Sequence, residues 1–233
     1  MASVADYNQR LFAKPGLRSY YHLSRFRWLH ERLHQESKPL RIVELGCFDG
    51  RVLQYTPATV ERYVGLDANW EGGLDLGRAA YAGRPEISLI ECNCAETLRQ
   101  FPDRSFNTAV SLETLEHIPE PAMREYLAEI ARVTDGHFFV SVPNEMGPVF
   151  LAKYLMKRAV YGDSENYTLK EIIAATARQS HKVRRHEHKG FDYRRLIDEL
   201  AVHFDILRVE GLASFGLPPA LSLSVGIVAR TVH

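Results

Sequence analysis

Apolar residues along the chain follow two periods, one typical of helices and one typical of strands. Over residues 7–36 they recur at every third or fourth position, as in Leu23, Phe26, Leu29 and Leu33, which predicts an amphipathic helix. Short apolar runs then predict strands at 41–45, 63–67, 87–92, 106–111 and 136–142. Helical stretches separate several of these runs. Strands that alternate with helices form a mostly parallel sheet covered on both faces.

The regular alternation stops after Pro143, and residues 145–190 form an extra segment. Helices are predicted from residue 51 onward, over 120–133 with Pro121 in the first turn, and at 149–158, 169–178 and 191–204. Two closing strands, 205–210 and 221–231, leave no room for a helix between them and should pair antiparallel. The pattern therefore predicts an α/β fold: a doubly wound, Rossmann-like, seven-stranded, mostly parallel sheet with an antiparallel terminal strand and a helical insertion.

Composition narrows the class of protein. The 233 residues include 29 Lys and Arg and 29 Asp and Glu, so the formal net charge is 29 − 29 = 0. A general nucleic-acid binder usually has a basic excess, so no nucleic-acid partner is expected. Hydrophobic residues make up 45% of the chain, enough to form a folded core rather than a disordered chain.

Three cysteines, Cys47, Cys92 and Cys94, and no recognisable signal peptide favour a reducing, cytoplasmic location. The Cys92-x-Cys94 pair has no second pair at zinc spacing, so no zinc site is predicted.

The uncharged run 211–229 is nearly long enough to cross a bilayer, but its end alternates apolar and polar residues. Alternation indicates a strand, so we expect no membrane-spanning helix there.

The chemistry should lie where parallel strands end. The first strand ends in the glycine-bearing turn 46–50 and the second on Asp67, and ligands of open parallel sheets bind at such strand ends. Gly46 and Gly50 let the backbone approach a ligand closely, and a carboxylate can accept two hydrogen bonds from a ribose diol. A dinucleotide turn would need glycine where Phe48 and Arg51 stand, and no phosphate loop is present. A phosphate-free adenosine cofactor fits, and S-adenosyl-L-methionine is the one predicted.

Three motifs carry a family resemblance. Glu-Leu-Gly-Cys-Phe-Asp-Gly at 44–50 is similar to the first motif of class I S-adenosylmethionine-dependent methyltransferases, and Val-Gly-Leu-Asp at 64–67 resembles their second. Residues 103–119 resemble the fourth-strand region of the branch that includes ubiquinone and menaquinone methyltransferases. The resemblance covers residues 40–142 and, more loosely, 191–231. It implies methyl transfer from S-adenosylmethionine.

The resemblance and the acidic residues that suit a cationic cofactor tail together predict one cofactor site, made of Glu44, Gly46, Cys47, Asp49, Gly50, Asp67, Ala68, Cys94, Ala95 and Ser111. Within it, the family pattern implies that Asp67 holds the ribose, that Cys94 and Ala95 meet the adenine, and that Ser111 lies beside the methionine amino group. Two residues depart from the pattern. Phe48 replaces the middle glycine, and Cys94 stands where the family often has Asp.

Plainer interpretations remain open for these residues. Asp67 could be an ordinary strand-end cap, and Asp49 could simply stabilise the turn through its own backbone. Cys47 is more typical of a small buried residue than of a nucleophile.

Three histidines are candidates for a catalytic base, in the order His188, His186 and His117. A histidine with a pKa near about 6.5 can take a hydroxyl proton as the methyl group arrives. The alternatives are a solvated basic loop for the first two and a structural role for the third. His186 and His188 could also suggest a metal, but the sequence identifies no carboxylate partner, so no metal site is predicted.

We expect a single domain with four parts: N-terminal helices over the site in 1–38, the cofactor-binding core in 39–144, an acceptor cap in 145–190, and 191–233, which completes the core. The basic run 182–189 is either a solvated face or a binding surface for an anionic acceptor. Together with the apolar residues around Phe150 and Leu155 it suits an amphiphilic acceptor or peripheral contact with a membrane surface.

The predicted function is methyl transfer to a small-molecule, sugar or lipid-like acceptor. The alternatives are another adenosyl-cofactor reaction, or a non-catalytic binding or partner subunit on the same fold, because a fold alone does not fix function. The sequence leaves the oligomeric state open.

Overall fold

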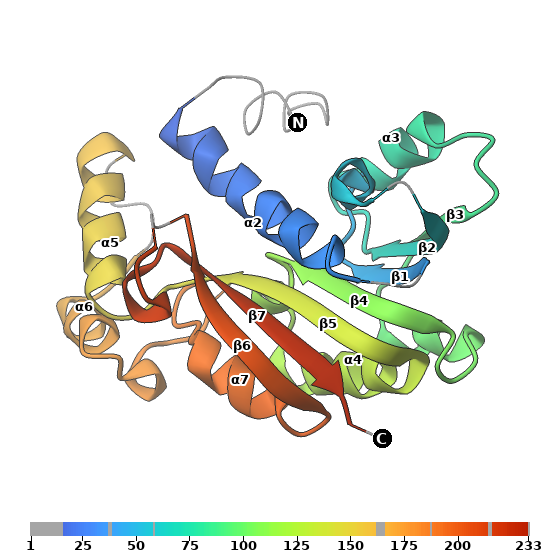
Figure 1. Cartoon of the computed structure of the whole chain (residues 1–233). Helices are drawn as coiled ribbons and strands as arrows, with labels where there is room; N and C mark the ends of the chain where they lie inside the picture. Colours follow the sequence, from blue (N-terminus) through green and yellow to red (C-terminus); the bar gives the residue numbers. More distant parts are fainter. Residues whose placement is uncertain are drawn as a thin grey trace.

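The computed structural model describes residues 16–36, 39–57, 59–161, 166–186, 188–213 and 216–232. In this part of the chain one sheet has the strand order β3-β2-β1-β4-β5-β7-β6 (Figure 1). Its strands are β1 (Leu40–Leu45), β2 (Val60–Asp67), β3 (Ile87–Glu91), β4 (Phe106–Leu112), β5 (Thr134–Pro143), β6 (Phe204–Leu212) and β7 (Ser224–Thr231). Strands β1 to β5 pair in parallel, whereas β7 is antiparallel to both β5 and β6. The predicted fold class is confirmed.

Helices cover both faces of this sheet: α2 (Leu17–Leu33), α3 (Gly73–Ala80), α4 (Glu120–Val133) and α7 (Tyr193–Leu200). Helices α4 and α7 lie on one face, and α2 and α3 lie on the other (Figure 1). Helix α4 occupies the predicted residues, because Met123, Leu127 and Ile130 form a buried stripe at helical spacing.

Helix α2 is anchored to the last strands of the chain. Its Trp28 ring lies so close to Gly226 of β7 that a Cβ atom there would be 2.7 Å from the ring. The Trp28 indole nitrogen donates to Glu210 of β6 at 2.7 Å, and Arg32 forms an ion pair with the same carboxylate at 2.6 Å. Residues 7–15 of the predicted N-terminal helix lie outside the described residues.

Two helices are shorter than the sequence pattern suggested. The segment after β1 is a five-residue 3-10 helix, Arg51–Tyr55, because Pro57 pushes Thr56 into an extended conformation. Helix α7 starts only at Tyr193, because the Asp192 side chain accepts a hydrogen bond from the Arg194 amide and so fixes the N-terminus there.

Helices α5 (Pro148–Tyr161) and α6 (Leu169–Thr176) follow β5 and lie together at one end of the sheet (Figure 1). Phe150 and Tyr154 of α5 pack against Tyr167, which precedes α6, and Ala174 and Ala175 of α6 belong to the same buried cluster. The carboxylate of Glu171 joins α6 to the segment after it. It accepts from the Thr168 amide at 2.9 Å and from Lys189 at 2.9 Å, and these two donors, in that order, lower its pKa to about 2.

Among the helices of the described residues, none has the length and apolar character needed to cross a bilayer. The uncharged run 211–229 ends in β7, as its alternating pattern predicted. Ser224, Val225 and Ile227 of this strand are buried in the sheet.

Candidate cofactor and acceptor site

The turn after β1 has a left-handed conformation at Gly46 and packs closely against Thr114. Gly46 has φ +80°, and a Cβ atom at this position would lie 2.0 Å from the Thr114 hydroxyl oxygen. Only glycine meets both conditions without strain. The amide of Gly46 donates to the Leu66 carbonyl at 2.7 Å, and Gly50 closes the turn by donating to the Cys47 carbonyl at 2.8 Å. The predicted turn is therefore built on the glycines that the sequence singled out.

Asp67 lies directly beside this turn. One carboxylate oxygen accepts from the Phe48 amide at 2.9 Å, and the other accepts from the Asn69 amide at 2.8 Å. Each oxygen has a second lone pair, so the side chain can still accept hydrogen bonds from a diol. The strand-end cap and the ribose ligand are thus compatible roles for the same carboxylate. Ala68, next along the chain, is half-buried at the same strand end.

Phe48 replaces the glycine of the family pattern, but its side chain packs against α3 and not across the turn. Its φ of +50° is left-handed, and its ring packs on α3, where a Cβ atom on Gly73 would come within 2.4 Å of it. The ring is therefore directed to α3, while its amide is used by Asp67.

The two acids and the cysteine of the first motif are in different surroundings. Glu44 is fully buried and accepts a short hydrogen bond from the Tyr63 hydroxyl, and burial raises the pKa of its carboxyl well above the usual range. Asp49 is half-buried and forms an ion pair with Arg51 at 3.4 Å. Burial also raises the pKa of the Cys47 thiol, so the thiolate is disfavoured, as the interpretation of a small buried residue predicted.

The last predicted cofactor residues follow β3 and β4. Cys94 is exposed at the start of a 3-10 helix (Ala95–Gln100), and Ala95 behind it is buried. Ser111 is fully buried near the end of β4, and its hydroxyl has no hydrogen-bond partner among the described residues. A buried hydroxyl without a partner is unfavourable by itself, which fits a residue whose partner is a bound molecule. The residues therefore fit a cofactor with a polar amino-acid tail.

Two of the three predicted histidines come together. The rings of His117 and His188 lie 4.3 Å apart, centroid to centroid, although 71 residues separate them in the chain (188 − 117). His186 is exposed, joins Lys189 through backbone hydrogen bonds, and is not part of this cluster. The structure thus separates the candidates that sequence order had placed side by side.

Glu116, which the sequence analysis did not single out, completes the cluster. One of its carboxylate oxygens is 3.9 Å from His117 Nε2 and 4.0 Å from His188 Nδ1. The side chain is fully buried, and neither oxygen has a hydrogen-bond partner among the described residues. Burial, and then the neighbouring Glu113, raise the pKa of its carboxyl well above the usual range. Its signal in the sequence was the Glu-x-x-Glu-His run, 113–117, directly after a buried strand.

Glu113 links this cluster to the surrounding elements. Its carboxylate accepts from Ser224 of β7 at 2.7 Å and from Tyr21 of α2 at 3.4 Å. Arg185, close in the chain to His188, donates a short hydrogen bond to the Glu116 carbonyl. Elements distant in the sequence therefore converge on the loop after β4.

His188 is expected to make the protein less stable in acid. Burial, and then His117, lower its pKa from 6.5 to about 4. Between these values the unfolded chain binds a proton that the folded chain does not, so the free energy of unfolding falls as the pH falls from 6.5 to 4. Urea unfolding across this range should show a shallower pH dependence for His188→Gln than for His186→Gln. Equal slopes in the two variants would contradict the assignment.

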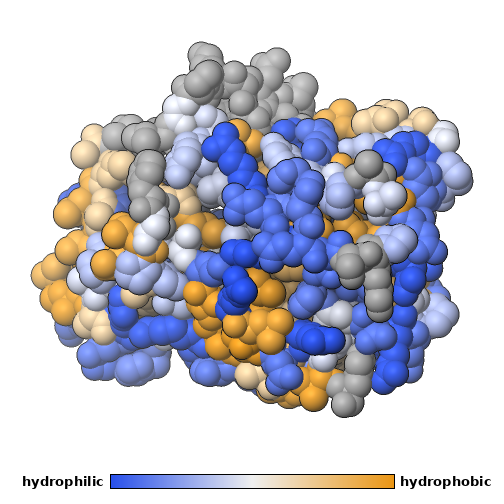
Figure 2. Space-filling model, viewed as in Figure 1, coloured by the Kyte–Doolittle hydropathy of each residue, from blue (hydrophilic) through white to orange (hydrophobic). Residues whose placement is uncertain are grey.

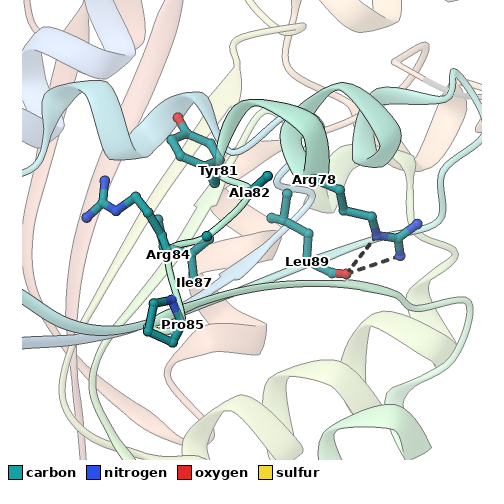
Figure 3. Close-up of a pocket in the computed structure, with 8 residues that line it drawn as sticks. Arg78, Tyr81, Ala82, Arg84, Pro85, Ile87 and Leu89 are labelled. Carbon is teal, nitrogen blue, oxygen red and sulfur yellow. Dashed lines mark hydrogen bonds between the residues drawn. The ribbon is translucent and has the colours of Figure 1, made fainter.

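A hollow of about 540 Å³ lies elsewhere, beside the edge strand β3 (Figure 3). Tyr81, Arg84 and Ile87 line it, and Arg78 donates from Nη2 to the Leu89 carbonyl at 3.1 Å. None of the predicted site residues lines this hollow. The residue chemistry described above instead gathers at the carboxyl ends of β1, β2 and β4.

Comparisons with known proteins identify a methyltransferase domain in this chain. A family model described as a methyltransferase domain matches residues 43–140. A protein named probable S-adenosylmethionine-dependent methyltransferase from Mycolicibacterium smegmatis is 29% identical over 135 residues, which are 57% of this chain and 49% of that protein. A ubiquinone biosynthesis O-methyltransferase from Paraburkholderia phymatum is 30% identical over 106 residues, 42% of this chain and 41% of the relative. The chain thus spans about half the length of these curated relatives, or less.

Solved structures show the same fold. The Burkholderia thailandensis 1,6-didemethyltoxoflavin-N1-methyltransferase, solved with its acceptor and S-adenosylhomocysteine, aligns with a TM-score of 0.59 at 18% identity. The alignment covers 100% of this chain and 92% of that one. S-adenosylmethionine is the cofactor of the matching family. Residues 43–140 therefore carry the match to a methyltransferase domain, and the chain is similar to S-adenosylmethionine-dependent methyltransferases in sequence and fold.

Proposed function

We propose that this protein transfers a methyl group from S-adenosylmethionine to a small-molecule, sugar or lipid-like acceptor. One observation carries the proposal: the glycine turn beside Asp67 and the Glu116–His117–His188 cluster follow strands of the same parallel sheet and therefore lie at the same edge. The turn and Asp67 can hold a nucleoside, and the Glu116–His117–His188 cluster can accept a proton from the acceptor. Two similar proteins are named for a ubiquinone-biosynthesis O-methyl transfer and for an N1-methyl transfer to 1,6-didemethyltoxoflavin, which supports a small acceptor.

Different residues of the proposed site would contact different parts of the cofactor. Backbone groups of 46–50 would hold the methionine part, Asp67 the ribose, Cys94 and Ala95 the adenine, and Ser111 the amino group. The surrounding carboxylates, among them Asp49 and Glu113, suit the positive charge of a sulfonium. When bound, the cofactor supplies an electrophilic methyl group, and holding the acceptor in line with it can contribute up to about 7–11 kcal/mol.

The proton of a hydroxyl acceptor would go to His188. The bound cofactor would supply the methyl group, and the acceptor hydroxyl would lose its proton as its oxygen is methylated. The neutral imidazole of His188 would take the proton, and Glu116 lies 4.0 Å from its Nδ1, where ionisation of the carboxyl would stabilise the charge that forms. The lowered pKa of His188 keeps its imidazole neutral at neutral pH, so the ring can accept a proton.

The same three side chains could hold a divalent cation. Their ligand atoms all lie within 4.8 Å of one another, and two imidazoles with one carboxylate form a common ligand set. The carboxylate that the sequence analysis could not identify is Glu116. A cation at this position would favour the ionised form of an acceptor hydroxyl, with His117 and His188 acting as ligands.

The segments around the site suit their proposed roles. Helix α2 contacts the loop after β4 through Tyr21, which supports the N-terminal segment as a cover over the site. Residues 145–190 bring His188 to the same loop, which supports this segment as the acceptor cap. The free thiols of Cys47, Cys92 and Cys94 support the cytoplasmic location predicted from the sequence.

Calorimetric titration with S-adenosylmethionine, followed by methyl transfer to a panel of phenol, amine and isoprenoid-quinol acceptors, tests the proposal. Binding with turnover supports it. Binding without any turnover across all acceptor classes would favour the non-catalytic subunit instead. No detectable binding by the wild-type protein would contradict both.

Replacing Asp67 with Asn should weaken S-adenosylmethionine binding by about 1–3 kcal/mol, because hydrogen bonds to a charged group are lost while the shape is kept. Isothermal titration of the wild type and the variant measures the difference. Asp75→Asn, on the exposed surface of α3, is the matched control and should bind as the wild type does. Equal affinity of Asp67→Asn and the wild type would refute the ribose role.

A further inference from the structure

Exposed apolar side chains concentrate on the two helices that follow β5. Of eleven large apolar residues exposed in the described parts of the chain, four belong to α5 and α6: Leu155, Met156, Leu169 and Ile173. Their exposures are 56%, 61%, 73% and 60%. Figure 2 shows apolar side chains along the side of the molecule formed by these helices. We call these four residues the apolar patch.

Positive charge accompanies the apolar patch. Residues 145–190 contain nine Lys and Arg and five Asp and Glu, a net charge of 9 − 5 = +4, while the whole chain is neutral. In the described part of this segment both acidic side chains are bound to lysines, Glu145 to Lys153 at 2.5 Å and Glu171 to Lys189 at 2.9 Å. The side chains of Lys170, Lys182 and Arg184 are exposed. The charge presented to solvent here is therefore positive.

We propose that α5 and α6 dock this protein on a membrane that contains anionic lipids. The four aliphatic side chains would enter the boundary between headgroups and acyl chains, while the lysines and Arg184 would meet lipid phosphates. A nucleic acid would match the charge but would offer nothing apolar to these four side chains. The proposal rests on surface residues alone, so it can be tested whether or not methyl transfer has been detected.

Docking by these helices would also place the proposed acceptor site close to the bilayer. The segment that carries the apolar patch continues along the chain to His188 and Lys189, and the Glu171 carboxylate joins α6 to Lys189. If the proposed function holds, a lipid-soluble acceptor would reach the site from the membrane.

Co-sedimentation of the full chain with lipid vesicles tests the proposal. At low salt, the wild type should pellet with vesicles of phosphatidylcholine and phosphatidylglycerol, stay in solution with phosphatidylcholine alone, and be released as salt is added. Lys170→Gln with Lys182→Gln should weaken partition about 25-fold, from about fivefold for each positive charge removed. The matched control, Arg104→Gln with Arg195→Gln, changes two exposed charges elsewhere and should partition as the wild type does.

A second pair of variants isolates the apolar contribution. Leu155→Ser with Ile173→Ser should lose vesicle binding, whereas Val202→Ser with Leu207→Ser, exposed near the start of β6, should retain it. Thermal melts establish that all variants fold. Failure of the folded wild type to bind anionic vesicles at low salt, or equal loss in patch and control variants, would overturn the proposal. A dimer that Leu155→Ser with Ile173→Ser converts to a monomer would also overturn it, because a second copy would then cover the patch.

Discussion

Gly46→Ala is expected to lower the free energy of unfolding by about 2–5 kcal/mol and to abolish measurable S-adenosylmethionine binding. A non-glycine residue at φ +80° costs about 1–2 kcal/mol. The new methyl group must also displace Thr114, whose hydroxyl oxygen lies 2.0 Å from the Cβ position, and overpacking of this kind typically adds about 1–3 kcal/mol. Urea unfolding and calorimetric titration measure the two effects.

Gly83 offers a matched control, because its φ is +84° and nothing lies within 4 Å of a Cβ atom built on it. Gly83→Ala should therefore show the conformational cost alone and bind the cofactor normally. Adding Thr114→Gly to Gly46→Ala removes the clash and should recover part of the lost stability. If Gly46→Ala and Gly83→Ala were equally stable and bound the cofactor equally, the close approach at Gly46 would have no functional meaning.

His188→Gln is expected to lower turnover by about 10²–10⁴-fold, the usual contribution of a positioned base, while S-adenosylmethionine affinity stays unchanged. His186 lies two residues away and outside the cluster, so His186→Gln should retain wild-type turnover. Single-turnover methyl transfer, once an acceptor has been found, measures the chemical step. A His188→Gln protein with full turnover would leave the histidine as a loop residue.

Glu116→Gln should separate function from stability. It should reduce turnover as His188→Gln does, yet raise the free energy of unfolding at pH 7, because a buried carboxyl with a raised pKa destabilises the folded state at high pH. A residue with a purely structural role would lose stability instead. Chelator treatment then distinguishes the two mechanisms: loss of activity that Mn²⁺ restores in the wild type points to a bound cation, and insensitivity points to direct proton transfer.

Local patterns predicted the sheet well. The short, mostly apolar runs of β1 and β4 and the buried stripe of α4 are strong local signals. The direct connection between the last two strands correctly predicted antiparallel pairing. Helix ends were harder to predict. Pro57 and the Asp192 cap each fix the conformation of one or two residues, and the spacing of apolar residues does not reveal such local effects.

The glycine turn after β1 could also be predicted, because glycines and acids directly after strands mark the edge where ligands bind. The His–Glu cluster could not, because it depends on a contact between the loop after β4 and the segment after α6. Spacing in the sequence favoured His186 and His188 as a pair. In the fold, His188 instead contacts His117, and both rings lie next to Glu116.

The contact between Trp28 and Gly226 has a consequence for synthesis of the chain. Strand β7 follows all other strands of the sheet in the sequence, yet it pairs with both β5 and β6 and packs against the Trp28 ring. A nascent chain that stops before β7 would leave Trp28 and Phe139 facing water and two strand edges open. Chaperones that shield exposed aromatic surface would therefore find their target in the interval between synthesis of β5 and synthesis of β7.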